Sequence, residues 1–249
     1  MHKFFVSKEN ISEDTILITG DDVKHIGKVL RLKVGDKINI SDGNSTEYIC
    51  ELDLIDKKEV VCNIIEKFQN KTESPICITL FQGLPKAQKM ELIIQKGVEI
   101  GIKNIIPVLT ERVVVKTETR DISGKIERWN KISKEAAKQS GRGTILELNN
   151  PITFKEAIES LNKFDLAVIP YENQQGIGLK KVLRNLDSNV KNVAIFIGPE
   201  GGFEEEEVNY AIEKGVHPVT LGPRILRTET AGLVASSIIL YELGDMGGI

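Results

Sequence analysis

Two glycine-rich segments near the C-terminus have the residue types of a small-ligand site. They are Ile197-Gly-Pro-Glu-Gly-Gly-Phe203 and Leu221-Gly-Pro-Arg-Ile-Leu-Arg-Thr-Glu-Thr-Ala231. Glycine lets a backbone approach a ligand closely and tolerates positive φ, and the free N–H groups at the start of a following helix can bind polar edges. A pocket of this kind suits a flat heterocycle attached to an amino acid. Either segment alone is more simply explained as an ordinary turn.

Other site chemistries lack their sequence patterns in this chain. There is no Gly-x-Gly-x-x-Gly after a strand, no Gly-x-x-x-x-Gly-Lys-Ser/Thr and no Gly-x-Ser-x-Gly, which disfavours dinucleotide binding, triphosphate binding and a serine nucleophile. The three cysteines lie in apolar, strand-like runs without metal-ligand or redox spacing, and the three histidines are scattered. We therefore expect no metal site, and buried thiols in a reducing compartment.

Each glycine-rich segment follows a predicted strand and precedes a predicted helix. The strands are 192–196 and 216–220, and the helices begin at Glu204 and Thr228. Ligands of open α/β sheets bind at the carboxyl ends of the strands. The two segments are therefore expected to form one cleft.

The remaining periodicity predicts two domains. Up to about residue 70 the chain is mostly strands, at a spacing that suits a small barrel, interrupted by one helix over Asp22–Leu32 with Val23, Ile26, Val29 and Leu30 on its apolar face. After a polar linker near residues 67–74, strands alternate with helices, which predicts a mostly parallel sheet covered on both faces. We place the boundary between 1–72 and 73–249. The predicted strands are 3–6, 15–18, 37–41, 46–54, 59–65, 76–81, 104–109 and 165–169, and the further helices are 86–100, 125–139, 154–161 and 179–186.

Basic residues suggest an anionic partner. The net charge is −3, yet the stretch from Pro85 to Gly143 holds thirteen Lys and Arg against seven Asp and Glu, a balance of 13 − 7 = +6. Such a stretch can face nucleic acid or can be two solvated helix faces. The candidates for RNA contact are Lys24, His25, Lys28 and Arg31 on the first predicted helix, together with Lys86, Lys89 and Arg142.

No signal peptide or membrane span is visible, so we expect a cytoplasmic protein.

The two C-terminal segments together resemble the ribosomal RNA small subunit methyltransferase E family of the SPOUT superfamily. Other parts of the chain agree, over nearly its whole length: 25–31 with Gly35-Asp36, Gln95–Gly101, Glu135–Arg142 and Pro170-x-Glu172. The resemblance implies a PUA-like β-barrel on a trefoil-knotted α/β methyltransferase domain, and a homodimer. It also implies S-adenosylmethionine as cofactor and N3 of a uridine in 16S ribosomal RNA as acceptor. Knots are so rare that periodicity alone would not suggest one.

The same resemblance nominates site residues. Candidates for the cofactor are Ile197, Gly198, Glu200, Gly201, Gly202, Leu221, Gly222, Ile225, Leu226, Arg227, Thr230, Ala231, Pro170 and Glu172. Uracil N3 must lose its proton before it attacks the methyl group, and a nearby cation favours the uracil anion. Arg227 is the candidate cation, unless it pairs with Glu229 or Glu200. Those two glutamates are candidate proton acceptors, although an N-cap or turn role explains either one more simply. Thr228 and Thr230 are expected either to cap the last helix or to bond the cofactor.

Two other functions stay open at this stage. A ribose 2′-O-methyltransferase would use the same cofactor segments with a different acceptor, and a non-catalytic protein would bind ribosomal RNA with an empty pocket. The sequence does not identify the general base or say whether a partner chain completes the site. The final predicted helix, rich in small and aliphatic residues, permits a dimer without requiring one. Basic surfaces in both domains favour the assembled small subunit over protein-free RNA.

Overall fold

A computed structural model of the chain describes residues 1–112, 119–171, 177–186 and 189–248. Contacts divide the chain into two compact units. The first contains Met1–Glu73 together with Ala137–Ile145, and the second contains Ser74–Ala136 together with Leu146–Ile249. The sequence boundary near residue 72 lies close to the first division, but no sequence signal had indicated that 137–145 joins the N-terminal unit.

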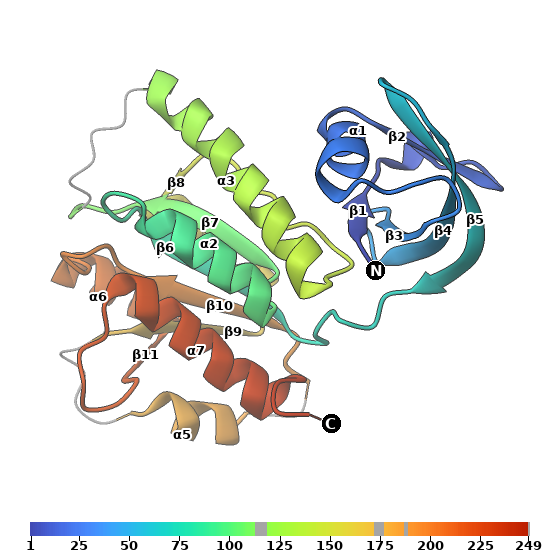
Figure 1. Cartoon of the computed structure of the whole chain (residues 1–249). Helices are drawn as coiled ribbons and strands as arrows, with labels where there is room; N and C mark the ends of the chain where they lie inside the picture. The colour runs from blue at the N-terminus through green and yellow to red at the C-terminus, as the bar shows by residue number, and fades with distance from the viewer. Residues whose placement is uncertain (113–118, 172–176, 187–188, 249) are drawn as a thin grey trace. The chain divides into compact units, whose positions relative to one another are not determined.

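The first unit is built on a curled five-stranded sheet (Figure 1). Its strands are paired in the order β1-β3-β4-β5-β2, antiparallel except for β1 with β3. Alternate residues such as Ile38, Ile40, Leu52 and Val60 are buried in one core, as expected for strands with one buried face. Among the described residues β1 and β2 do not pair, so the small barrel predicted from the sequence is an open, curled half-barrel. The bounds are β1 Lys3–Phe5, β2 Thr15–Thr19, β3 Lys37–Ser41, β4 Thr46–Ile55 and β5 Glu59–Gln69.

The helix predicted over Asp22–Leu32 ends at Leu30, and most of it is wider than a regular α-helix. A single α-helical turn, α1 (Asp21–Lys24), continues as a π-helical segment, His25–Leu30, which ends where Arg31 takes a left-handed conformation with φ 53°. A π-helical turn contains more residues than an α-helical one. Val23 and Ile26 are therefore buried as predicted, whereas Val29 is 66% exposed, so its assignment to the apolar face was wrong.

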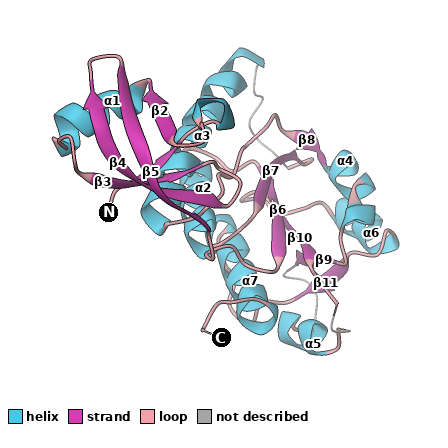
Figure 2. Cartoon of the chain, turned by 90° about the vertical axis from the view of Figure 1, so that its right-hand side faces the viewer, coloured by secondary structure: helices cyan, strands magenta, loops and turns pink. Residues whose placement is uncertain are grey.

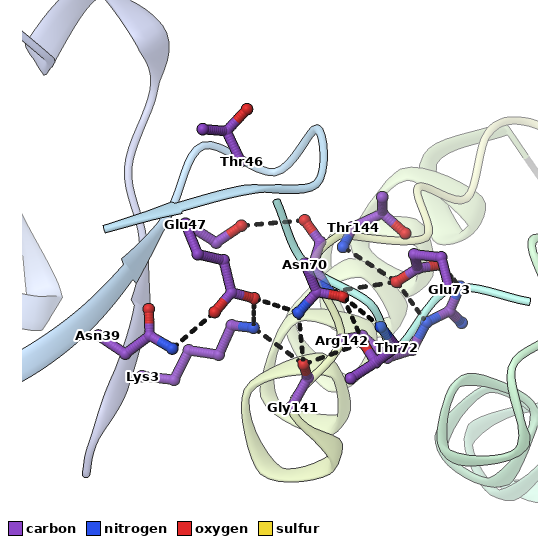
Figure 3. Close-up of polar contacts among 12 residues, drawn as sticks. Lys3, Asn39, Thr46, Glu47, Asn70, Thr72, Glu73, Gly141, Arg142 and Thr144 are labelled. Carbon is purple, nitrogen blue, oxygen red and sulfur yellow. Dashed lines mark hydrogen bonds and ion pairs between the residues drawn. The ribbon is translucent and has the colours of Figure 1, made fainter. Parts of the chain in front are cut away.

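The 137–145 segment is attached to the half-barrel by buried polar contacts (Figure 3). Glu47 pairs with Lys3 and accepts hydrogen bonds from Asn39 and Asn70, while Lys3 and Asn70 also donate to the carbonyl oxygen of Gly141. Since Lys3 and Glu47 have side chains only 7% and 3% exposed, their charges are stable there only as long as each keeps its partner.

The second unit contains a six-stranded, all-parallel sheet in the order β11-β9-β10-β6-β7-β8. This confirms the α/β architecture predicted from the alternation of strands and helices. The trefoil knot stays a prediction. The bounds are β6 Cys77–Gly83, α2 Lys89–Ile100, β7 Asn104–Leu109, α3 Thr119–Ser140, β8 Ile152–Thr153, α4 Phe154–Glu159, β9 Leu166–Pro170, α5 Leu179–Arg184, β10 Asn192–Ile197, α6 Glu205–Glu213, β11 His217–Val219 and α7 Thr228–Leu243.

Helices cover both faces of this sheet (Figure 2). On one face α7 packs against α2, α5, β6 and β10. On the other, α4 and α6 bury a core with Phe81 and Phe196 of adjacent strands, whose rings stack at 4.7 Å. The strands are therefore nearly continuous apolar runs, as parallel strands buried on both faces require. No helix in the described part of the chain is long and apolar enough to cross a bilayer.

Candidate active site at the carboxyl ends of three strands

A cavity of about 750 Å³ lies at the carboxyl ends of the neighbouring strands β9, β10 and β11. Parallel strands end at the same edge of a sheet, so the loops that follow them meet there. The structure brings the two glycine-rich segments together as predicted. The cavity is lined by Lys89, Arg112, Pro170, Tyr171, Ile197 to Phe203, Glu205, Val219 to Thr228, and Ala231.

The loop after β10, which we call the first glycine loop (residues 198–203), is a tight turn. The N–H of Gly202 donates to the carbonyl oxygen of Pro199 at 2.9 Å, and Gly202 has φ +69°. A side chain on Gly198 would lie 2.9 Å from the backbone of Gly202. These two positions therefore require glycine, one for its conformation and one for close backbone contact.

The loop after β11, the second glycine loop (residues 221–227), is held to the first by α7. Gly222 has φ +124°, and its N–H donates to the Thr220 hydroxyl at 3.2 Å. At the start of α7 the buried hydroxyl of Thr228 donates to the carbonyl oxygen of Gly198 at 2.6 Å and accepts from Gln82 at 2.9 Å. Thr228 therefore joins the loops directly, and its side chain does not cap α7.

One lysine and two glutamates form an ion-pair cluster at the cleft. The ammonium of Lys89 lies 2.8 Å from Glu200 and 3.4 Å from Glu229. The hydrogen bond to Glu200 raises the pKa of Lys89. Burial opposes ionisation of Glu200, but hydrogen bonds from Lys89 and from the backbone N–H groups of Glu200 and Lys86 lower its pKa overall. Lys89 and Glu200 are therefore both charged at neutral pH.

Arginines supply the remaining positive charge of the cleft. Arg112, which follows β7, donates to the carbonyl oxygen of Gly201 at 2.9 Å and pairs with Glu204 at 2.7 Å. Arg227 is exposed and, within the described part of the chain, forms no ion pair. The alternative in which Arg227 pairs with Glu200 or Glu229 is thus not realised, because Lys89 occupies both carboxylates.

Most of the residues nominated for the cofactor line this cavity. The exceptions are Thr230, which is exposed at the first turn of α7 and not part of the lining, and Glu172, which lies outside the described residues. Glu229 reaches the cleft only through Lys89. The lining residues among the candidates are Pro170, Ile197, Gly198, Glu200, Gly201, Gly202, Leu221, Gly222, Ile225, Leu226, Arg227 and Ala231.

Sequence reasoning missed several polar residues of the cleft. Lys89 was assigned to RNA contact, and neither Arg112 nor Tyr171 was nominated. Arg112 and Tyr171 follow the carboxyl ends of β7 and β9, so applying the strand-end rule to every strand would have found them. No local signal distinguishes Lys89 from the other lysines of its helix.

The other basic candidates separate into exposed and buried residues. Lys24, His25, Lys28, Arg31 and Lys86 are exposed. Arg142 is not: its side chain is 4% exposed and pairs with Glu73 at 2.6 Å (Figure 3). Because this guanidinium is enclosed within the first unit, the RNA contact expected of Arg142 conflicts with its position.

The cleft fits S-adenosylmethionine in size and chemistry. Its volume falls within the range of roughly 300–1,000 Å³ usual for small-molecule pockets. Ile197, Leu226 and Ala231 give an apolar wall for a base, and the glycine loops offer backbone groups to its edge. The carboxylate of Glu200, which lines the cavity, suits a cationic ligand.

Comparison with known proteins gives matches over both units. Residues 72–240 match the RNA methyltransferase domain family and residues 18–65 match the RNA methyltransferase PUA domain family. Ribosomal RNA small subunit methyltransferase E of Bacillus subtilis is 38% identical over 97% of each chain, and that of Buchnera aphidicola is 33% identical over 96% of this chain and 92% of its own. A crystal structure of ribosomal RNA small subunit methyltransferase E from Neisseria gonorrhoeae bound to S-adenosyl methionine has TM-score 0.87 and 30% identity, covering 99% of each chain.

Proposed function

Because the chain belongs to the ribosomal RNA small subunit methyltransferase E family, we propose that it methylates 16S ribosomal RNA of the small subunit with S-adenosylmethionine. The acceptor that we propose is N3 of a uridine. The observation that carries the proposal is the single cleft formed by two glycine loops at the ends of adjacent strands. Its size, its apolar wall and its backbone groups suit the cofactor that the Neisseria relative binds.

The chain's task in this reaction is alignment and charge stabilisation. Bound S-adenosylmethionine supplies an activated methyl group, so that an N–C bond forms as the C–S bond breaks. The glycine loops, fastened by Thr228, fix the geometry in which the acceptor nitrogen meets that methyl group, and orientation of this kind supplies much of the rate of a two-substrate reaction.

Arg227 has the position and charge expected of the group that favours the uracil anion. It is an exposed cation between the second glycine loop and α7, and no described carboxylate neutralises it. An opposite charge nearby lowers the pKa of an acid, so the guanidinium eases loss of the N3 proton. Glu200 and Glu229 are held by Lys89, which favours an anchoring role for both over that of proton acceptor.

RNA contact is assigned to the exposed basic residues. Lys24, His25, Lys28 and Arg31 follow one another along α1 and the π-helical segment of the half-barrel, and Lys86 lies beside the cleft loops. Phosphate neutralisation by such side chains dominates RNA affinity. We also propose a homodimer, which the partly exposed aliphatic residues of α7 and the 68% exposed Tyr241 would support.

Transfer of labelled methyl groups tests the proposal. Small subunits lacking the modification, protein-free 16S RNA and large subunits are incubated with the purified protein, and the modified nucleotide is identified after digestion. We expect 3-methyluridine, with more transfer to assembled small subunits than to free RNA. Methyl on a ribose would replace the N3 assignment by a 2′-O one. No transfer to any RNA, with no binding of the cofactor, would overturn the enzymatic function.

A further inference from the structure

We infer that Lys89 is a positioning residue that clamps the cofactor cleft, and not a contact to RNA. This inference rests on the proposed function, since it concerns the same cleft. It deepens that function by identifying what holds three separate chain segments in one arrangement around the ligand.

Lys89 contacts both glycine-loop regions from a third segment. It is the first residue of α2, which follows β6. Its ammonium pairs with Glu200 of the first glycine loop at 2.8 Å and with Glu229 of the first turn of α7 at 3.4 Å. One side chain therefore connects the segments that follow β6, β10 and β11.

A second contact strengthens the same connection. The backbone N–H of Lys86 donates to both carboxylate oxygens of Glu200, at 3.1 and 3.2 Å. Glu200 is thus held by the segment that precedes α2 as well as by its first residue. Because both oxygens are engaged, displacing Lys89 would also loosen this backbone contact.

The burial of the cluster makes its charges interdependent. The side chains of Lys89, Glu200 and Glu229 are 31%, 28% and 13% exposed. One oxygen of Glu229 is buried and, within the described part of the chain, accepts no hydrogen bond; its ion pair with Lys89 is at 3.4 Å. Without the ammonium, two carboxylates would face one another at the cleft, and like charges in one site repel. The repulsion would push the first glycine loop away from α7.

An RNA-contacting lysine would look different. Such a residue presents a free ammonium to solvent, as Lys86 does with an exposed side chain. The ammonium of Lys89 is already paired with two carboxylates. Loss of Lys89 should therefore change cofactor affinity, whereas loss of an RNA contact should change RNA affinity and its salt dependence.

The test compares Lys89→Met with Lys96→Met, which removes the same charge farther along α2. Within the described part of the chain, Lys96 pairs only with Glu99 of its own helix. S-Adenosylmethionine binding is measured by calorimetry, and binding to a 16S RNA fragment over a range of salt concentrations. We expect Kd for the cofactor to rise about tenfold or more in Lys89→Met, with RNA affinity and its salt slope unchanged. Lys96→Met should bind the cofactor like the unaltered protein.

Two further variants separate positioning from general damage. Lys89→Arg keeps the charge and should restore most of the cofactor affinity. Lys89→Met combined with Glu229→Gln removes one of the two opposed charges and should bind the cofactor more tightly than Lys89→Met alone. If Lys89→Met does not fold, Glu200→Gln breaks the same pair and should give the same loss of affinity.

The contrary outcomes are distinct. Unchanged cofactor affinity in Lys89→Met, or in Glu200→Gln if that variant is used instead, would overturn the clamp and leave the proposed function intact. A fall in RNA affinity alone would restore the RNA-contact role. Failure of the unaltered protein to bind the cofactor would overturn both the clamp and the proposed function.

Discussion

The hydroxyl of Thr228 donates a 2.6 Å hydrogen bond to the carbonyl oxygen of Gly198 and so joins the two glycine loops. Thr228 is 7% exposed, and its hydroxyl oxygen also accepts a hydrogen bond from the buried side-chain amide of Gln82. A contact of this kind fixes the distance between the loops. Cleft geometry should therefore depend on it.

Replacing Thr228 by valine keeps the shape of the side chain and removes the hydroxyl. The carbonyl oxygen of Gly198 and one N–H of Gln82 then lose a partner, and we expect the free energy of unfolding to fall by about 1–3 kcal/mol. S-Adenosylmethionine affinity should fall as well. Thr228→Ser retains the hydroxyl and serves as the matched control in urea unfolding and calorimetry. Equal stability of the valine and serine variants would argue against this role.

Gly202→Val should abolish cofactor binding while the protein stays folded. No atom lies within 4 Å of a Cβ at this position, so the cost arises from φ +69° and not from a collision. A left-handed conformation costs an ordinary residue roughly 1–2 kcal/mol, and the turn would rearrange to relieve it. Gly202→Asn is the control, because asparagine tolerates this conformation. Calorimetry showing normal binding by the valine variant would contradict the expectation.

Arg227→Met should reduce kcat by about 100-fold, comparable to the loss of one donor that stabilises a developing anion. Cofactor Kd should change little. Because N3 deprotonates more readily as pH rises, the deficit should narrow toward alkaline pH. Initial rates of methyl transfer from pH 6 to 10 give this comparison, with Arg227→Lys as the charge-preserving control. A deficit that does not vary with pH would mean that Arg227 has another role.

Arg142→Met should destabilise the first unit and leave RNA affinity and its salt dependence unchanged. Removing one partner of the buried pair with Glu73 leaves an uncompensated carboxylate, for which we expect a loss of about 3–5 kcal/mol. Arg31→Met, at the exposed residue that follows the π-helical segment, should instead lower the salt slope of RNA binding by about 1 with little change in stability. Urea unfolding and titration of RNA binding with salt distinguish the two variants. A reduced salt slope in Arg142→Met would mean that Arg142 contacts RNA after all.

Elements with strong periodicity could be predicted from the sequence. Alternation along 37–41 and 46–54, and the apolar runs at 76–81 and 192–196, each correspond to an observed strand. The meeting of the two glycine loops also followed from local patterns, because parallel strands share the edge at which they end.

Features that depend on distant partners could not be predicted. The side chain of Lys89 has the same composition and spacing as solvated lysines of its helix, and only its contacts with Glu200 and Glu229 distinguish it. The π-helical widening after Lys24 could not be predicted, because the spacing of three residues from Val23 to Ile26 to Val29 is that of an ordinary α-helix. Arg142 counted as a positive charge in the sequence, whereas its burial beside Glu73 depends on packing.

The N-terminal unit is made of two separate stretches of the chain, which limits how it can be exchanged between related proteins. A fragment ending at residue 73 would leave Glu73 without Arg142, and Lys3 and Asn70 without the Gly141 carbonyl oxygen that both contact. Chimeras with a relative should therefore exchange residues 1–73 and 137–145 as one cassette. A single crossover near residue 73 would separate halves of a polar network that have to match.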